Sequence, residues 1–322
     1  MWPTPKFTPP TALALEITWV MASPVPDLAE LLPSWQLSLR AERRSKETLD
    51  AYTQGVRQFL AYCDRTGTPP VLSKATVSAF VADLLDRGAE PTTARLRQTA
   101  LKRYSAWLAA EGEADHDDLL GLKPPRLDTK VVSPLTEDQL RALFKACHGR
   151  DFRDLRDEAI SRLMAETGLR ASEAAGLAVT DVDRIGGMVT ARRGKGGRGR
   201  MAPFGAKTAQ AIDRYLRARR HHPMAETSPA LWLGVHANST GLTYDGLYAA
   251  LKYRAKLAGL ENFHPHQLRH TAATRWLARG GTEGGLMTVA GWSNRAMLDR
   301  YTAATASERA AAEARRLNLG DL

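Results

Sequence analysis

Apolar side chains recur every three or four residues along the first third of the chain, which predicts amphipathic helices. Ser45 is a suitable N-cap for one of these helices, and Gly67 ends it. Its apolar stripe consists of Leu49, Tyr52, Val56, Phe59, Leu60 and Cys63. Similar stripes precede and follow it. The pattern therefore predicts a helical unit over residues 27–112.

The pattern changes over residues 113–133, which are first acidic and then Pro-rich. The residues responsible are Asp115, Asp117, Asp118, Pro124 and Pro125. This composition predicts an interdomain linker. Residues 1–26 are also Pro-rich and are expected to be a disordered extension. Their composition leaves open whether translation begins at Met1 or Met21.

Helical periodicity resumes at residue 134 and predicts a second unit that extends to residue 322. Thr136 and Gln139 have the spacing of a capping box. Between Val179 and Phe204, glycine turns separate short β-prone runs, which predicts a small three-stranded antiparallel sheet. Later helices are predicted over residues 207–219, 244–258, 265–278, 283–290 and 307–317. The expected fold class is therefore mainly α with a small antiparallel sheet (α+β).

The charge of the chain indicates what kind of partner it binds. The 322 residues include 45 Lys+Arg and 35 Asp+Glu, a net charge of +10. Such an excess favours a polyanion, although charge alone does not choose among DNA, RNA and an anionic membrane. Cys63 and Cys147 lie far apart at apolar helical positions, which predicts buried free thiols. No apolar run approaches about 18 residues, so we expect a cytoplasmic protein with no membrane partner.

The first candidate chemical motif is Thr-Gly-Leu-Arg-Ala-Ser-Glu at residues 167–173. Gly168 suits the end of one helix, and Ser172 is a candidate cap for the next. Arg170 is either an ordinary surface arginine or a guanidinium aimed from a tight turn at a phosphate. In the second case Glu173 would orient it.

The second motif is a basic, glycine-rich run at residues 192–200. Its cations are Arg192, Arg193, Lys195, Arg198 and Arg200. A phosphate loop of the Walker type requires Ser or Thr after Gly-Lys and then a helix, whereas Gly196 follows here and strands flank the run. Two interpretations remain: a solvated basic hairpin, or a hairpin that carries Lys195 into a DNA groove.

The third motif is His-Gln-Leu-Arg-His at residues 266–270. His266 and His270 have a spacing used by zinc proteins, but Arg269 lies between them and no third ligand is evident. The alternative is an oxyanion site made by His266, Arg269 and the helix N-terminus.

Two aromatic residues complete the set. Trp292 follows Gly291 and is either a core residue or a donor to a ligand through its indole N–H. Tyr301 is by default a packing residue. As a nucleophile it would need a base and cationic neighbours, because a free phenol has a pKa of about 10.

Taken in order, these pieces resemble the tyrosine recombinase (phage integrase) family, of the simple integrase or Xer-like type. The matching pieces are residues 167–173, 194–198, 266–271 and 291–301. The helical first unit is similar to the family's SAM-like core-binding domain, and the second unit to its catalytic domain. One departure is Trp292, since many members have His there.

The resemblance implies a site-specific recombinase that cleaves and rejoins DNA through a 3′-phosphotyrosyl intermediate. Tyr301 would be the nucleophile, Arg170 and Arg269 would clamp the phosphate, and Lys195 would protonate the leaving oxygen. His266 would act as the base and Trp292 would contact or enclose the phosphate, with Glu173 and His270 supporting them. No metal and no other cofactor would be needed.

The resemblance also implies partners. They are double-stranded DNA with inverted core-type half-sites and an accessory excision factor. Four copies of the chain would form a homotetramer on that DNA. Expected DNA contacts are Arg43, Arg44, Lys46, Arg95, Arg97, Lys102, Arg103, Arg192, Arg193, Arg198 and Arg200. A mobile-element integrase is favoured. The alternatives are a Xer-type dimer resolvase, a type IB topoisomerase-like enzyme, a non-catalytic DNA-binding relative and a zinc protein. The C-terminal helix would dock in cis or in trans.

Overall fold

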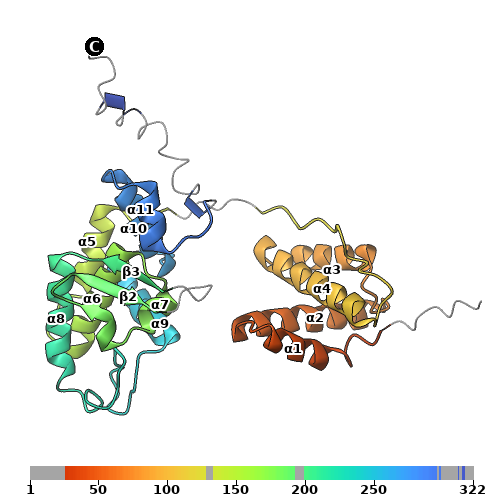
Figure 1. The fold of residues 1–322 in the computed structure, drawn as a ribbon, viewed down its shortest axis with the longest axis horizontal. Coiled ribbons are helices and arrows are strands. Elements are labelled where there is room, and N and C mark those ends of the chain that lie inside the picture. Colours follow the sequence, from red (N-terminus) through yellow and green to blue (C-terminus); the bar gives the residue numbers. More distant parts are fainter. Residues whose placement is uncertain are drawn as a thin grey trace, which may run out of the picture. The chain divides into compact units, whose positions relative to one another are not determined.

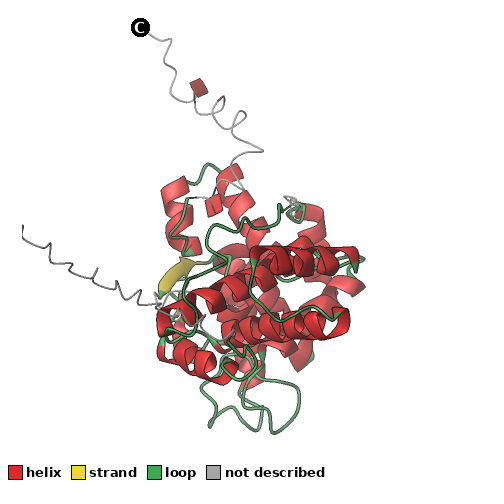
Figure 2. Ribbon diagram, turned by 90° about the vertical axis from the view of Figure 1, so that its right-hand side faces the viewer, coloured by secondary structure: helices red, strands yellow, loops and turns green. Residues whose placement is uncertain are grey.

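The structure is a computed structural model that describes residues 26–127, 133–192, 199–295, 297–298, 311 and 314–315. The chain divides into two compact units, Met1–Thr129 and Lys130–Leu322. Helices dominate the described residues, and the strands form one small sheet (Figure 2). The predicted fold class, mainly α with a small antiparallel sheet, is confirmed. No helix in the described ranges is long and apolar enough to span a membrane.

In the described part of the first unit, four helices follow one another (Figure 1). They are α1 (Leu32–Ala41), α2 (Lys46–Thr66), α3 (Lys74–Asp86) and α4 (Pro91–Glu111). Ser45 caps α2 by accepting a hydrogen bond from the N–H of Thr48 at 3.3 Å. Gly67 ends the same helix in the left-handed conformation, with φ of 66°. The predicted caps therefore define these helix boundaries.

The core of the first unit is built around Trp35 and Tyr104, whose rings stack with centroids 4.7 Å apart. The hydroxyl of Tyr104 donates to the carbonyl oxygen of Leu28 at 2.8 Å, so this buried phenol has a polar partner. Helices α2 and α4 approach closely where Gly55 faces Ala100, because a Cβ at Gly55 would lie only 2.6 Å from the Ala100 Cβ. This contact fixes the spacing of the two longest helices of the unit.

The predicted linker differs from the structure over its first half. Leu119 is fully buried in the core of the first unit, and Ser105 donates to the Asp117 carboxylate at 2.5 Å. Lys102 donates to the carbonyl oxygen of Leu122 at 2.8 Å. The acidic residues suggested a solvated connection, but one of them accepts a hydrogen bond from α4. The segment up to about Lys123 therefore packs on the first unit.

The second unit begins with α5 (Glu137–Ala146), α6 (Phe152–Thr167) and the short α7 (Ala171–Ala175). The predicted capping box opens α5. Thr136 Oγ1 accepts from the N–H of Gln139 at 3.1 Å, and Gln139 Oε1 accepts from the N–H of Thr136 at 2.9 Å. Helix α6 is the centre of the unit, because it packs against α8 (Ala206–Arg219), α9 (Tyr244–Leu257) and α10 (His266–Ala278) (Figure 1).

A single turn of 3-10 helix (Val179–Asp181) leads into the sheet, whose described strands pair antiparallel in the order β1-β2-β3. The strands are β1 (Val182–Asp183), β2 (Met188–Ala191) and β3 (Arg200–Pro203). The predicted antiparallel sheet is confirmed. Its inner face is apolar, since the opposed residues Val189 and Ala202 are both fully buried. Strand β3 lies against α11 (Glu283–Ala290).

Both cysteines are buried and free, as predicted. Burial raises the pKa of the Cys147 thiol to about 12. Most of the predicted helix at residues 307–317 lies outside the described residues. Within that range the structure describes residues 311, 314 and 315, which are helical.

Candidate active site

The turn that carries Arg170 is shaped by Gly168. Helix α6 ends at this glycine, whose φ of 63° is left-handed and suits a residue without a Cβ. Leu169 is fully buried, and Arg170 then occupies the N-cap position of α7. Ser172, the residue predicted to cap this helix, lies within α7 instead. The turn leaves the Arg170 side chain 28% exposed, enough for it to contact a ligand.

Glu173 accepts hydrogen bonds from Arg170 and also from a second arginine. Its Oε2 accepts from the backbone N–H of Arg170 at 2.7 Å, and its Oε1 accepts from Arg170 Nη1 at 2.7 Å. Arg200 Nη1 and Nη2 donate to the same two oxygens at 2.7 and 2.8 Å. Burial acts to raise the pKa of Glu173, but donation from Arg200 and Arg170 outweighs it and holds that pKa below its ordinary value. The carboxylate is therefore charged at neutral pH.

Arg200 does not lie where the sequence placed it. It was expected among the DNA-contacting cations, yet its side chain is only 7% exposed. Besides its two bonds to Glu173, it donates from Nε to the carbonyl oxygen of Val289 at 2.7 Å. The sequence of a basic run does not show which of its cations faces inward. The acidic partner of Arg200 is Glu173, which lies 27 residues away in the chain.

Arg269 is buried between two backbone carbonyls. It lies on α10 and is 2% exposed. Its Nη1 donates to the carbonyl oxygen of Gly168 at 2.6 Å, and its Nη2 to that of Ala290 at 2.7 Å. Both acceptors are neutral, so these bonds orient the guanidinium without cancelling its charge. They also tie α10 to the turn before Arg170 and to the end of α11.

Trp292 lies next to Arg269. Gly291 ends α11 with a left-handed φ of 64°, and Trp292 follows it with 6% exposure. The Arg269 Cζ is 5.3 Å from the centroid of the indole, a cation–π distance. Trp292 also packs among Ala273, Leu277 and Leu286. It therefore forms a wall beside Arg269 and is part of a small apolar core.

The two histidines lie at the start of α10, as predicted. His266 is the first residue of the helix and is exposed, whereas His270 is half-buried. Their rings meet edge to face, with centroids 4.8 Å apart. Among the residues that the structure describes, no group of three His, Cys, Asp or Glu side chains is arranged to hold a metal ion.

The structure thus brings together Arg170, Glu173, Arg269 and Trp292 from three separate segments. Lys195 and Tyr301 lie outside the described residues, as do Arg193 and Arg198. Sequence reasoning missed the internal role of Arg200 and the two carbonyls that hold Arg269. No local signal identifies a carbonyl acceptor, because every residue carries one.

The remaining predicted DNA contacts fall into two groups. The exposed ones are Arg43, Arg44, Lys46, Arg95, Arg103 and Arg192. The others make internal bonds. Arg97 bridges α4 and α2 through Gln58 at 2.7 Å and the carbonyl oxygen of Ala51 at 3.0 Å, and Lys102 donates to Leu122. Arg192 contacts Asp181 and, at 3.0 Å, Thr180, but its side chain stays 62% exposed. The exposed group is the better candidate for phosphate contact.

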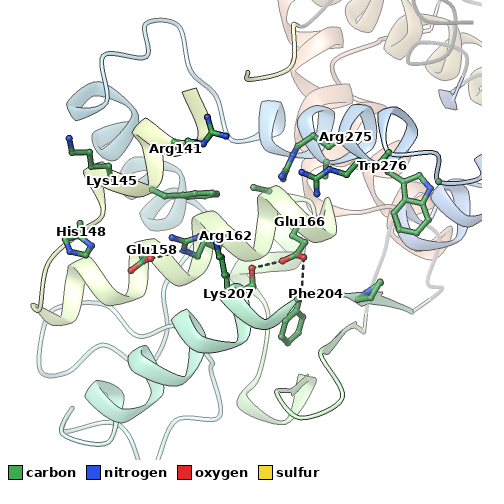
Figure 3. Close-up of a pocket in the computed structure, with 18 residues that line it drawn as sticks. Arg141, Lys145, His148, Glu158, Arg162, Glu166, Phe204, Lys207, Arg275 and Trp276 are labelled. Atoms are coloured by element: carbon green, nitrogen blue, oxygen red, sulfur yellow. Dashed lines mark hydrogen bonds and ion pairs between the residues drawn. The ribbon is translucent and has the colours of Figure 1, made fainter. Parts of the chain in front are cut away.

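A separate hollow of about 1110 Å³ lies between α5, α6, the start of α8 and α10 (Figure 3). Glu166 on its wall accepts from Thr208 Oγ1 at 2.6 Å and from the N–H of Gly205 at 2.9 Å, which ties α6 to the start of α8. None of the described catalytic candidates lines this hollow. The hydrogen bonds of Glu166 in its wall hold the surrounding helices together.

Comparison with known proteins identifies the family. The chain belongs to the phage integrase family: the model of that family matches residues 133–308. The model "Phage integrase, N-terminal SAM-like domain" matches residues 31–111. The protein is therefore a tyrosine recombinase, an enzyme of site-specific DNA recombination.

Among its relatives is the tyrosine recombinase XerD of Neisseria meningitidis serogroup B, 31% identical over 245 residues that cover 74% of this chain and 80% of XerD. The tyrosine recombinase XerC of Mycobacterium bovis is 32% identical over 265 residues, covering 80% and 88%. The Tn1549 transposon integrase bound to transposon right end DNA shares the fold, with a TM-score of 0.70, 18% identity and coverage of 90% of this chain and 99% of that one.

Proposed function

We propose that Tyr301 attacks a phosphorus atom of the DNA backbone through its phenolic oxygen. A P–O bond to Tyr301 forms, the bond to the 5′ oxygen breaks, and Lys195 gives that oxygen its proton. His266 takes the phenolic proton. The resulting 3′-phosphotyrosyl link conserves the phosphodiester bond energy, so a 5′-hydroxyl of a partner strand reverses the step without ATP. Lys195 and Tyr301 take these roles from the family resemblance.

The observation that carries the proposal is the pair of arginines on two tethered segments. In the transition state, negative charge builds on the non-bridging oxygens, and guanidiniums stabilise it because they donate in pairs. Arg170 is partly exposed on its turn, and Arg269 is held against that same turn through Gly168. Trp292 encloses this side of the site, while Glu173 and His270 support Arg170 and His266. No metal ion or other cofactor enters the scheme.

We infer that the partner is double-stranded DNA with inverted core-type half-sites, bound by a homotetramer. The fold of lambda integrase supports this inference. A lambda integrase dimer bound to a core site has a TM-score of 0.65 to this chain, and a tetramer bound to a Holliday junction one of 0.63. The exposed cations of the first unit would supply phosphate contacts. Affinity would then fall steeply as salt rises, because phosphate contact releases counterions.

For the biological role we propose a phage or other mobile-element integrase that works in the cytoplasm with an accessory excision factor. The resemblance in fold to a transposon integrase supports this role. The XerC and XerD relatives favour a second candidate, a Xer-type dimer resolvase. The DNA that flanks the gene separates them. Attachment-site repeats that recombine in a plasmid assay would support the integrase, and recombination only at a chromosomal dimer-resolution site would support the resolvase.

The chemistry is tested with a duplex site selected by the protein from a random pool and then nicked beside the scissile phosphate. Wild type should accumulate a covalent adduct that Tyr301→Phe cannot form while still binding the duplex. Tyr253→Phe is the matched control, since Tyr253 is 51% exposed on α9. Adduct formation by Tyr301→Phe would refute the assignment.

Three further observations separate the alternatives. EDTA should leave adduct formation unchanged, and inhibition would support a metal on His266 and His270. Relaxation of supercoiled plasmids that lack the selected site would indicate a topoisomerase. Site-specific binding without any adduct in the wild type would indicate a non-catalytic relative.

A further inference from the structure

Arg200 occupies a position inside the active site rather than on the DNA-facing surface. All three of its guanidinium nitrogens donate: Nε to the carbonyl oxygen of Val289 and the two terminal nitrogens to Glu173. Its Cδ lies so close to Gly291 that a Cβ there would be 2.8 Å from it. Arg200 therefore joins β3 to the start of α7 and to the turn before Trp292.

Glu173 is shared by two arginines in a way that limits what each can do. The described residues donate four hydrogen bonds to its carboxylate, two from Arg170 and two from Arg200. Two carboxylate oxygens offer about four lone-pair sites, so this acceptor is saturated. Arg170 has a single terminal nitrogen on Glu173 and keeps its other N–H groups available at its exposed tip.

The charge balance depends on the same sharing. With Arg200 present, one carboxylate serves two guanidiniums, so the group keeps a net positive charge. Without Arg200, the buried carboxylate would face Arg170 alone. The two would then form a neutral pair, and the fork of Arg170 would be free to turn onto both oxygens. A guanidinium engaged in that way would attract a phosphate less strongly.

We propose that Arg200 is a positioning residue for strand cleavage. By holding both oxygens of Glu173, it keeps Arg170 aimed at the scissile phosphate and leaves the charge of Arg170 uncompensated. This inference rests on the proposed function, because it assigns Arg170 to that phosphate. It requires no contact between Arg200 and DNA.

The test measures single-turnover adduct formation at saturating enzyme together with the dissociation constant for the selected duplex. Arg200→Lys keeps the charge but cannot donate to both Glu173 oxygens and to Val289. It should slow cleavage by about tenfold or more, with affinity changed by less than about threefold. Arg200→Met should be slower still. Arg184→Lys is the matched control, since Arg184 makes an exposed ion pair with Asp213 at 2.7 Å.

A double-mutant cycle with Arg170→Lys distinguishes positioning from general loss of structure. If Arg200 acts through Arg170, Arg200→Lys should add little to the defect of Arg170→Lys. Independent defects that multiply, or an Arg200→Lys variant that cleaves at the wild-type rate, would overturn the inference. A fall in affinity equal to the fall in rate would make Arg200 a DNA contact.

A failure of the proposed role of Arg200 can be distinguished from a failure of the proposed function. If wild type forms the adduct and Arg200→Lys matches it, only the role of Arg200 fails. If wild type forms no adduct, or Tyr301→Phe forms one, the proposed function itself fails. Thermal unfolding of each variant shows whether it is folded. If Arg200→Met does not fold, the cleavage rate of Arg200→Lys alone tests the role of Arg200.

Discussion

Arg269 donates from Nη1 to the carbonyl oxygen of Gly168 at 2.6 Å, although 101 residues separate the two in sequence. This bond connects the helix that carries one of the proposed catalytic arginines to the turn that presents the other. A small movement of α10 would therefore move both guanidiniums together. The Arg269 side chain is thereby fixed to the backbone of the turn that carries Arg170.

Replacing Arg269 with Lys should abolish most strand cleavage while leaving DNA binding largely intact. One ammonium cannot donate to both Gly168 and Ala290 and also to a phosphate, because it lacks the planar fork. We expect the single-turnover rate of adduct formation to fall by about a hundredfold or more. The matched control is Arg275→Lys on the same helix, where Arg275 pairs with Glu137 at 2.8 Å. Equal losses in the two variants would contradict a specific role for Arg269.

Replacing Gly168 with Ala should impair both stability and cleavage. The left-handed backbone costs a residue with a Cβ about 1–2 kcal/mol in the free energy of unfolding. The added methyl group would also lie 3.4 Å from the Ala272 Cβ and 3.9 Å from the Arg269 Cγ. Gly259→Ala is the control, because Gly259 has φ of 69° but an added Cβ there meets nothing within 4 Å. Denaturant unfolding should show both variants destabilised, whereas only Gly168→Ala should slow adduct formation beyond its loss of folded protein.

The second unit also depends on a buried carboxylate remote from the site. Asp157 is 1% exposed and accepts from Arg156 at 2.8 Å and from Arg254 at 2.9 Å. Asp157→Asn would leave two buried guanidiniums without their shared anion, which should cost about 3–5 kcal/mol. Asp213→Asn, at an exposed pair, should cost less than about 1 kcal/mol. Urea unfolding monitored by circular dichroism compares them, and similar midpoints would show that the buried network contributes little.

Stability should depend on Glu173 at acid pH. Its pKa in the folded chain lies below the ordinary value of 4.5, because donation from the two arginines outweighs burial. A lowered folded-state pKa contributes stability that is fully present above the unfolded-state value and is lost as the pH falls through the folded-state value. The difference in free energy of unfolding between wild type and Glu173→Gln should therefore be constant near neutrality and shrink below about pH 4.5. A difference that grows on acidification would contradict this assignment.

Much of the fold was predictable because it depends on local chemistry. Ser45 and the Thr136–Gln139 box each accept hydrogen bonds from backbone N–H groups within three residues, so their effect is visible in the sequence. The helical stripe around Phe59 is equally local, because one helix places those residues on one face. The first half of the predicted linker was wrong for the opposite reason. Leu119 is buried by helices that precede it in the chain, and the two residues before it are acidic.

The sequence by itself determined which residues are available for the chemistry, since side-chain type and order distinguish Arg170, His266, Arg269, Trp292 and Tyr301. It also determined that His266 and Arg269 lie at the start of a helix and that Trp292 follows a helix-ending glycine. Only the tertiary structure decided that Arg200 faces Glu173 rather than DNA and that Gly168 and Ala290 hold Arg269. Those pairings join residues between 21 and 101 positions apart. Their geometry arises when β3, α10 and α11 pack around one core, and no local pattern encodes that.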